Sequence, residues 1–333
     1  MKIVIQGAGA VGCYLGGALA HSGMDVTLIG RERLLDDLAS VGQLTLTDYL
    51  GNAHSVSSAK VTTSASVLAE ADFIILTVKC LGVSTAAEQI KEFSQVATPV
   101  LCLQNGIGSE QPLLGLTNPI IRGIVGFNVA PLGKGRFHRG TEGDIICEPC
   151  SFTKALAEAF AKIEVTFKQT NEFEAVRWAK LQLNLNNAIN ALSNLPLKQE
   201  LGTHAYRKVL SGAMSELLQV TQAKQLTLPK LTKLPAVWLP RLISVPDFLF
   251  TRLASSMLEI DPEARSSMWE DLNKGRQTEI DFINGAVVEE AKTIGISTPI
   301  NSALCSLIKT AETTTPPRNV SANDIMADIK KRR

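Results

Sequence analysis

Long hydrophobic runs, net charge and a signal-peptide pattern are all missing from this sequence, and each absence excludes a class of protein. No stretch of about 18 uncharged apolar residues occurs, so we expect no membrane span. The 33 basic and 32 acidic residues leave a net charge of +1, which supplies no electrostatic field for holding a nucleic-acid backbone. The first residues lead directly into a glycine-rich turn, without the charged start, apolar run and cleavage site of a signal peptide. We therefore expect a cytoplasmic protein that binds neither membranes nor nucleic acids.

Histidine and cysteine are also sparse, and their spacing argues against a metal site. The four histidines and six cysteines recur in no ligand spacing. Cys147 and Cys150 form a CxxC motif, but a zinc site would need a second CxxC or paired histidines nearby. A redox CxxC opens a helix after a strand, and this pair fits that interpretation as well. We interpret the pair as incidental, expect no metal ligands, and regard the cysteine content as ordinary for a reducing compartment.

The sequence does contain enough apolar residues for a packed core. Hydrophobic residues make up 45% of the 333 residues, which argues against disorder. Because a domain holds about 100–200 residues, the length predicts two domains. Strand signals stop near residue 170, and helical patterns follow. We therefore predict an α/β domain over residues 1–170, an all-α domain over 171–315 and a frayed C-terminal tail over 316–333.

A glycine-rich turn joins the first predicted strand, Lys2–Gln6, to a helix, and a second strand follows at 26–29. The turn reads Gly7-Ala8-Gly9-Ala10-Val11-Gly12. This GxGxxG motif lies in the strand, turn, helix and strand context, within about 30 residues, that binds a dinucleotide in the Rossmann fold. There Gly7 permits the turn, Gly9 lets the backbone approach a pyrophosphate, and Gly12 lets the helix pack on the strand. The helix N-terminus then faces the phosphates with its dipole and unpaired N–H groups.

The end of the second strand favours NADP(H) over NAD(H). An NAD-binding chain usually places Asp or Glu there to accept a hydrogen bond from the ribose 2′-hydroxyl. Here Gly30 and Arg31 follow the strand, and the planar guanidinium of Arg31 can pair with a 2′-phosphate. The alternative is that Arg31 lies in solvent beside a helix terminus. We predict NADPH/NADP+ as the cofactor and Arg31 as one of the residues that bind it.

Two further polar residues follow predicted strands of the first domain. Lys79 comes after a strand at 73–78, and Asn105 after a strand at 100–103. Open α/β sheets bind ligands outside the carboxyl ends of their strands, so we predict that both residues contribute to the cofactor site. A solvated lysine and a turn-forming Asn-Gly pair are the alternatives. Residues 120–148 alternate glycine with short apolar runs, which predicts antiparallel edge strands.

Residues 172–192 are predicted to form one helix with an amide-rich face. At about 100° per residue, Asn184 and Asn187 lie on the same side as Lys180, whereas the apolar side chains lie on another. Solvent-facing helix surfaces usually mix Glu, Lys and Arg, and asparagine is a poor helix former. We infer that this face forms hydrogen bonds across a cleft or inside the helical domain. A purely structural amide network is the alternative.

The rest of the second half contains two helical patterns and one unusual segment. A long helix is predicted over 266–292, bent at Gly275, and Pro299 begins the final helix. The segment 226–260 is long and apolar and holds four prolines. Extra helices packed on the core, or a substrate lid or subunit contact, would each account for it.

These motifs together resemble the ketopantoate reductase (2-dehydropantoate 2-reductase) family along essentially the full length of the chain. The residues that carry the resemblance are Gly7-Ala8-Gly9-Ala10-Val11-Gly12, Val78-Lys79, Gln104-Asn105-Gly106-Ile107-Gly108, Lys180-Leu181 with Asn184, Ser266-Ser267-Met268, and Gly275-Arg276-Gln277-Thr278-Glu279-Ile280-Asp281. The resemblance implies a Rossmann domain followed by an all-helical domain like that of 6-phosphogluconate dehydrogenase. It also implies NADPH-dependent reduction of 2-dehydropantoate to (R)-pantoate, a step towards pantothenate and coenzyme A.

The resemblance also implies roles for individual residues. Lys180 would be the general acid that protonates the ketone oxygen, and Glu279 would help to hold the lysine and the substrate. Asn105 would contact the cofactor–substrate region, Ser267 the polar end of the substrate, and Asn184 the substrate one turn from the lysine. We therefore expect a small-molecule 2-keto acid as the partner, at an active site where the two domains meet. A homodimer is left open as the assembly.

One departure from the family pattern concerns the amide-rich helix. Many members carry a second asparagine where this chain has Ala188. Asn187 and Asn190 both lie nearby, and we assign substrate binding to Asn187. Two other functions stay open: reduction of another branched 2-keto acid, and non-catalytic sensing of NADPH by the same fold. A sensor needs neither Lys180 nor Glu279, so the presence of both favours an enzyme.

Overall fold

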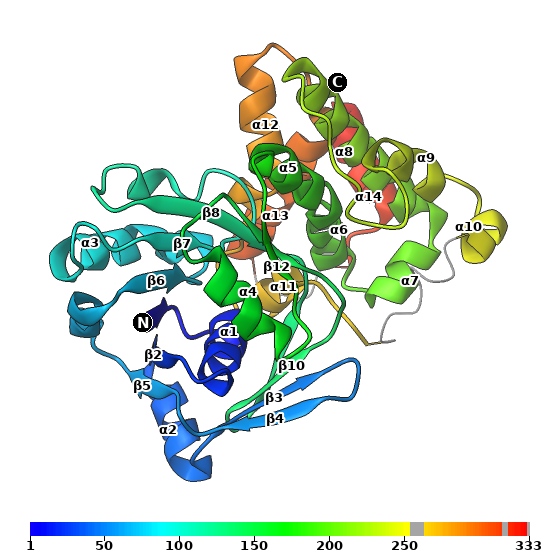
Figure 1. Ribbon diagram of the computed structural model, residues 1–333. Helices are drawn as coiled ribbons and strands as arrows, with labels where there is room; N and C mark the ends of the chain where they lie inside the picture. The colour runs from blue at the N-terminus through cyan, green and yellow to red at the C-terminus, as the bar shows by residue number, and fades with distance from the viewer. Residues whose placement is uncertain (254–262, 315–318, 332–333) are drawn as a thin grey trace. The chain divides into compact units, whose positions relative to one another are not determined.

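The computed structural model describes residues 1–253, 263–314 and 319–331, and it divides into two compact units (Figure 1). The first unit comprises Met1–Asn105 and Ser109–Phe173, and the second comprises Gly106–Gly108 and Glu174–Arg333. The first is an α/β unit and the second is helical, so the predicted fold class is confirmed. No sequence pattern indicates that the short segment 106–108 belongs to the second unit.

An eight-stranded sheet forms the centre of the first unit, because short and almost continuously apolar runs suit strands that are buried on both faces. In spatial order its strands are β12 (Phe167–Gln169), β11 (Ile145–Cys147), β8 (Ile120–Val125), β7 (Val100–Cys102), β6 (Phe73–Leu76), β1 (Lys2–Gln6), β2 (Asp25–Ile29) and β5 (Lys60–Thr62). The strands from β8 to β5 are mutually parallel. Their order is that of a doubly wound dinucleotide-binding sheet, and it places the carboxyl ends of β1, β6 and β7 side by side.

Helices cover both faces of this sheet. Alternate residues of β1 point to opposite sides, so Ile3 and Ile5 join one hydrophobic core and Val4 joins another. The first core includes side chains of α1 (Ala10–His21) and α4 (Thr153–Ala161), and the second includes those of α3 (Val83–Phe93). The other helical segments of this unit are α2 (Glu32–Val41), η1 (Ala65–Glu70), η2 (Cys80–Gly82) and η3 (Gln111–Leu113).

A second, smaller sheet packs on the outer side of α1. Its strands, in order, are β4 (Ala53–Val56), β3 (Leu44–Asp48), β10 (Arg136–Arg139) and β9 (Val129–Gly133). Leu46 of β3 contacts α1 so closely that a Cβ on Gly17 would lie 3.0 Å from its side chain. The helix is therefore enclosed between two sheets, and its residues from 12 to 20 are all buried.

The antiparallel pairing predicted over 120–148 is present, between β9 and β10 and between β8 and β11, but most of this range does not form edge strands of the main sheet. β8 runs parallel to β7, and β9 and β10 form a hairpin in the second sheet. Of these four strands, β11 is the one that extends the main sheet antiparallel to its neighbour β8. Gly133 and Gly135 both have positive φ at the tip of the hairpin, so glycine here marks a turn that leaves the main sheet.

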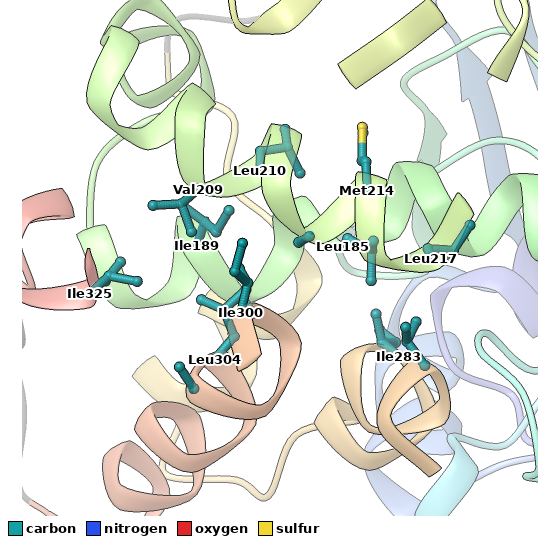
Figure 2. Packing of buried hydrophobic residues seen from close by; sticks show 14 of the residues in the cluster. Leu185, Ile189, Val209, Leu210, Met214, Leu217, Ile283, Ile300, Leu304 and Ile325 are labelled. Carbon is teal, nitrogen blue, oxygen red and sulfur yellow. The ribbon is translucent and has the colours of Figure 1, made fainter. Parts of the chain in front are cut away.

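Helices build the second unit. They are α5 (Phe173–Asn184), α6 (Asn186–Ser193), α7 (Leu197–Gly202), α8 (His204–Ala223), η4 (Ala236–Trp238), α9 (Leu239–Ile243), α10 (Asp247–Leu253), α11 (Ser267–Asn273), η6 (Ile280–Phe282), α12 (Asn284–Thr293), α13 (Pro299–Thr313) and α14 (Ala322–Lys331). Figure 2 shows part of their shared core, where Ile189 of α6, Val209 of α8, Leu304 of α13 and Ile325 of α14 are buried in one cluster.

Both long helices predicted for this unit are interrupted. The run over 172–192 divides at Leu185 into α5 and α6, in a stretch rich in asparagine, which is a poor helix former. The run over 266–292 ends instead of bending. Gly275 has φ +62° and donates from its N–H to the Leu272 carbonyl, while Arg276 N–H donates to the Asp271 carbonyl at 2.8 Å. This is a Schellman motif, which terminates α11.

The predicted frayed tail is also wrong for the residues that can be described. Residues 322–331 form α14, whose Ile325 and Ile329 are fully buried in the core of the second unit. Apolar residues at i and i+4 give this helix a buried stripe. Burial of that stripe stabilises the helix even though the chain ends in basic residues. In the segment 226–260, residues 254–260 lie outside the described residues. The earlier part contributes Leu239 and Phe250 to the core, as extra packed helices would.

Candidate active site

The glycine turn after β1 has the backbone geometry that its glycines require. Gly7 has φ +107°, and a Cβ on it would lie 2.4 Å from the backbone nitrogen of Val78. A Cβ on Gly12 would lie 2.4 Å from the Gly7 carbonyl oxygen and would push α1 away from the turn. Among the residues that the structure describes, none places an atom within 4 Å of the equivalent position on Gly9. Gly7 and Gly12 therefore allow the tight turn, and Gly9 leaves open space for a ligand.

The N-terminus of α1 presents hydrogen-bond donors beside that open space. Cys13 N–H donates the first helical bond, to the Gly9 carbonyl at 2.9 Å, so the N–H groups of Ala10, Val11 and Gly12 precede the helical ladder. The first turn of α1 carries no acidic side chain, and the helix dipole places partial positive charge there. These features fit the phosphates of a dinucleotide.

Lys79 and Asn105 lie on the loops after β6 and β7, and buried side chains tie those loops together. Cys80 Sγ donates to the Asn105 carbonyl oxygen at 3.0 Å. Gln104 is 8% exposed and donates from Nε2 to the Leu76 carbonyl oxygen at 2.8 Å. The structure therefore brings Lys79 and Asn105 to one edge of the sheet. The sequence analysis assigned no role to Gln104 or Cys80, because their contacts depend on which strands are neighbours.

The glycine turn is joined to the same edge. Thr77, just after β6, donates from Oγ1 to the Gly7 carbonyl oxygen at 2.8 Å. The Val78 backbone lies against Gly7, as its short distance to a Gly7 Cβ shows. Contacts between the ends of β1, β6 and β7 thus join the loops that carry Gly7, Lys79 and Asn105.

Arg31 is exposed at the N-cap position of α2. Its side chain makes no capping hydrogen bond, and a cation at a helix N-terminus is unfavourable to the helix dipole. An anion bound there would interact well with both the guanidinium and the helix. Gly30 precedes it, and a Cβ on Gly30 would lie 2.9 Å from a methyl group of Leu34. An acidic side chain at the first position after β2 would therefore require the Leu34 side chain to shift.

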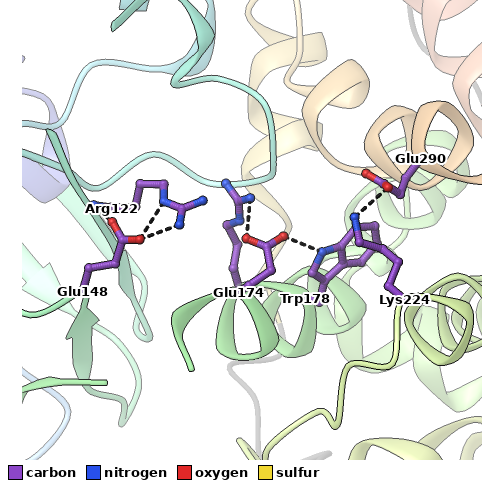
Figure 3. A network of polar contacts seen from close by, with 7 residues as sticks. Arg122, Glu148, Glu174, Trp178, Lys224 and Glu290 are labelled. Carbon is purple, nitrogen blue, oxygen red and sulfur yellow. Dashed lines mark hydrogen bonds and ion pairs between the residues drawn. The ribbon is translucent and has the colours of Figure 1, made fainter. Parts of the chain in front are cut away.

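In the second unit, Lys180 lies half-buried on α5, and a polar network fixes the start of that helix (Figure 3). Trp178 is fully buried and donates from Nε1 to Glu174 Oε1 at 2.9 Å. Lys224, the residue that follows α8, lies over the Trp178 ring, with Nζ 5.8 Å from its centroid, and forms an ion pair with Glu290 of α12 at 2.6 Å. These contacts hold α5 against α8 and α12 and so set the position of Lys180.

Asn184 and Asn187 follow Lys180 along α5 and α6, and α11 docks beside them. Both asparagines are half-buried. Ser266 caps α11 by accepting a hydrogen bond from Trp269 N–H, and its hydroxyl donates to the Asn187 carbonyl oxygen at 3.1 Å. Ser267, the exposed first residue of α11, therefore lies next to the start of α6. A shared role of Asn187 and Ser267 stays a prediction.

Asn190 does not share this exposure. It is fully buried and donates from Nδ2 to the Leu195 carbonyl at 2.9 Å and to Glu200 Oε2 at 3.2 Å. Its Oδ1 accepts from Ser266 N–H at 2.9 Å. Because its amide is fully engaged inside the protein, the structural-network interpretation holds for Asn190. Asn187 is half-exposed, so it is the better candidate to replace the family's second asparagine, whose position is occupied by Ala188 in this chain.

Glu279 lies on a short loop before η6 and is 8% exposed. The loop is anchored by Thr278, whose N–H and hydroxyl both donate to Glu312 Oε1 at 2.8 and 2.7 Å. At the end of η6, the Phe282 carbonyl oxygen accepts from Ile107 N–H at 2.8 Å, which explains why the segment 106–108 belongs to this unit. The pairing of Glu279 with Lys180 stays a prediction.

The described ranges contain no group of three or more His, Cys, Asp or Glu side chains that could hold a metal ion. None of the helices within those ranges combines the length and apolarity that crossing a bilayer demands.

Comparison with known proteins identifies the family. Residues 3–151 match the model described as ketopantoate reductase PanE/ApbA, and residues 172–312 match ketopantoate reductase PanE/ApbA C terminal. The 2-dehydropantoate 2-reductase of Pyrococcus horikoshii is 29% identical over 94% of this chain and 98% of its own.

Solved structures agree with that match. A PanE/ApbA family ketopantoate reductase from Ralstonia eutropha JMP134 is 29% identical with a TM-score of 0.79, and the alignment covers 94% of this chain and 98% of that one. A D-mandelate dehydrogenase in a ternary structure with NADH and anilino(oxo)acetate is 23% identical with a TM-score of 0.76, at the same coverage, and shares the fold. Since the two family models together span most of the sequence, the protein belongs to the ketopantoate reductase family.

Proposed function

We propose that this protein reduces 2-dehydropantoate (ketopantoate) to (R)-pantoate with NADPH, on the route to pantothenate and coenzyme A. Family membership supports an oxidoreductase of this type. The observation that carries the proposal is the placement of Lys180. This lysine is half-buried, one helical turn from Asn184, on a helix whose start is held by the buried Trp178.

Reduction of a ketone needs a hydride at carbon and a proton at oxygen. Bound NADPH would supply the hydride. Lys180 would act as the general acid, donating a proton from Nζ to the oxygen as negative charge develops on it. Glu279, which is largely buried, would favour the protonated ammonium form of Lys180 as a nearby anion. Exclusion of water around such a pair strengthens its electrostatic effect.

Amide and hydroxyl side chains would bind the substrate. Asn184, Asn187 and Ser267 can each donate and accept hydrogen bonds, which suits a molecule that carries a carboxylate, a ketone and a hydroxyl. Asn105 would contact both the cofactor and the substrate. The docking of α11 on α6 supports this assignment, because Ser266, the residue before Ser267, donates to the Asn187 carbonyl oxygen.

The preference for NADPH would depend on Arg31. We expect Arg31→Ala to weaken NADPH binding on the order of 10- to 100-fold, since a charged hydrogen bond to the 2′-phosphate is lost. NADH binding should change little. Arg33→Ala is the matched control, because Arg33 is also exposed on the first turn of α2. Titration of cofactor fluorescence measures both affinities, and equal losses for NADPH and NADH would contradict the assignment.

Oxidation of NADPH with a panel of 2-keto acids tests the substrate. We expect the highest kcat/KM for ketopantoate, with lower values for pyruvate and other branched 2-keto acids. A higher value for another branched 2-keto acid would assign the protein to that reaction instead. NADPH binding without turnover of any 2-keto acid would favour a sensor over an enzyme.

A further inference from the structure

The CxxC motif lies at a turn that the proposed reductase chemistry does not use. Cys147 is the last residue of β11 and is fully buried. Cys150 is partly exposed and stands three residues before the nine-residue helix α4 begins at Thr153. The sequence alone favoured an incidental pair. The strand, turn and helix around it are nevertheless the context in which a redox CxxC occurs.

The Cys150 sulfur is surrounded by hydrogen-bond donors. The thiol of Cys147 donates to it, as do the backbone N–H groups of Phe152 and Thr153 at the start of α4. The Thr153 hydroxyl oxygen lies 3.3 Å from the same sulfur. Such an arrangement stabilises a thiolate, because each donor and the helix N-terminus favour negative charge on sulfur.

Contacts with neighbouring strands hold both cysteines in place. Thr170 N–H donates to the Cys147 carbonyl oxygen at 2.9 Å, and Cys150 N–H donates to Gln169 Oε1 at 3.3 Å. The intervening Glu148 is paired with Arg122 of β8, whose Nε donates to Glu148 Oε1 at 3.0 Å (Figure 3). These bonds hold the backbone of the turn at both cysteines, and its one charged side chain is paired with Arg122.

Acidity separates Cys150 from the other cysteines. The hydrogen bond from Cys147, helped by Thr153 and the α4 backbone, lowers the pKa of Cys150 to about 6 despite its partial burial. The same bond raises the pKa of Cys147. Cys305 is the other partly exposed cysteine, and burial raises its pKa to about 12. At neutral pH, Cys150 is thus the partly exposed cysteine that carries a thiolate.

We propose that Cys147 and Cys150 form a thiol–disulfide exchange site for low-molecular-weight disulfides such as oxidised glutathione. The Cys150 thiolate attacks one sulfur of the disulfide, forming a mixed disulfide and releasing one thiolate, which takes up a proton from water. The Cys147 sulfur, losing its proton to water, then attacks Cys150 Sγ and releases the second thiolate. Two protein thiols are oxidised to one disulfide, and one small disulfide is reduced to two thiols.

Mass spectrometry of the full-length, reduced protein treated with oxidised glutathione at pH 7 tests this proposal. We expect the wild type to lose two hydrogens, with the new bond mapping to Cys147 and Cys150 in the peptides. Cys147→Ser should stop at one glutathione on Cys150, because the second thiol is missing. Cys150→Ser should give neither product. Cys305→Ser is the matched control and should behave as the wild type. Absence of the Cys150 mixed disulfide in Cys147→Ser would overturn the proposal.

Alkylation by iodoacetamide gives an independent measurement. At pH 7 we expect Cys150 to react on the order of 100-fold faster than Cys305, because its larger thiolate fraction outweighs its lower intrinsic nucleophilicity. Cys147→Ala should raise the pH at which the rate is half-maximal, since a hydrogen-bond donor is removed. Circular dichroism checks that each variant is folded. Equal rates for Cys150 and Cys305 would contradict the assignment of Cys150 as the attacking thiol.

Discussion

Lys180 is the residue on which the proposed chemistry depends most directly. We expect Lys180→Ala to lower kcat by about 10²- to 10⁴-fold, because a positioned proton donor is lost. The Kd of NADPH should stay within about twofold, as expected for a site change that leaves the glycine turn intact. Stopped-flow turnover with ketopantoate and fluorescence titration with NADPH measure the two quantities.

The control for that experiment is Lys198→Ala, which removes an exposed lysine of α7 in the same helical unit. It should leave both kcat and cofactor affinity unchanged. If Lys180→Ala turned over ketopantoate at the rate of this control, Lys180 would have no part in proton transfer.

At the same residue scale, the sequence distinguishes some side chains and not others. Lys180 and Asn184 could be assigned from a motif, since both stand at fixed spacing on one helix. The choice between Asn187 and Asn190 was less well determined, because both lie close in sequence to Ala188, where the family pattern has its second asparagine. The difference arises from Glu200, a residue on another helix that accepts a hydrogen bond from Asn190. Contacts of this kind depend on tertiary packing.

At the scale of single elements, substitutions in the glycine turn should separate a loss of stability from a loss of NADPH binding. Gly7→Ala introduces a methyl group where backbone lies 2.4 Å away and φ is +107°, so we expect loss of stability on the order of several kcal/mol. In Gly9→Ala, the added methyl group lies in open space within the protein. This variant should fold normally but bind NADPH more weakly, because the methyl group occupies the approach to the pyrophosphate.

Thermal unfolding and cofactor titration of both variants measure this separation. Normal NADPH affinity in Gly9→Ala would show that the pyrophosphate does not bind against Gly9. A stable Gly7→Ala protein would contradict the described turn.

Helix α14 supports a second prediction at this scale. Ile325 is fully buried against the core of the second unit, whereas Asn323 on the same helix is exposed. We expect Ile325→Ala to lower the free energy of unfolding by about 2–5 kcal/mol and Asn323→Ala to change it by less than about 0.5 kcal/mol. Urea denaturation measures both. A similar small change in the two variants would show that α14 does not pack as described.

Elements were predicted best where a local pattern decides them. The strands β1, β2, β6 and β7 could be read from short apolar runs, and α13 from its initial proline. The interruptions at Leu185 and Gly275 could not, since an asparagine-rich stretch and a single glycine are each compatible with a continuous helix. In the folded chain, a Schellman motif at Gly275 ends α11, and a turn at Leu185 separates α5 from α6.

At the scale of the whole molecule, one buried carboxyl should make stability depend on pH. Glu200 is fully buried, and burial raises its pKa from an ordinary 4.5 to about 8, against the lowering effect of bonds from Asn186 and Asn190. The folded state therefore binds this proton more tightly than the unfolded state. Its contribution to stability is complete below about pH 4.5 and is lost as the pH rises towards 8.

The loss over that interval corresponds to roughly 4 kcal/mol. We expect Glu200→Gln to remove this part of the pH dependence, because the amide carbonyl can still accept from Asn186 and Asn190 but does not titrate. Urea denaturation at the two ends of the interval measures the change, with the exposed Glu158→Gln as control. A Glu200→Gln protein with an unaltered pH profile would show that Glu200 is ionised throughout.

The enclosure of α1 between two sheets has a consequence for the energetics of cofactor binding. A helix that is buried from Gly12 to Ala20 and joined to a tight turn has little conformational freedom left to lose. Its phosphate-binding end is preorganised, so binding carries almost no ordering entropy for this part of the protein. The affinity of the dinucleotide for the first unit should then reflect the direct contacts alone.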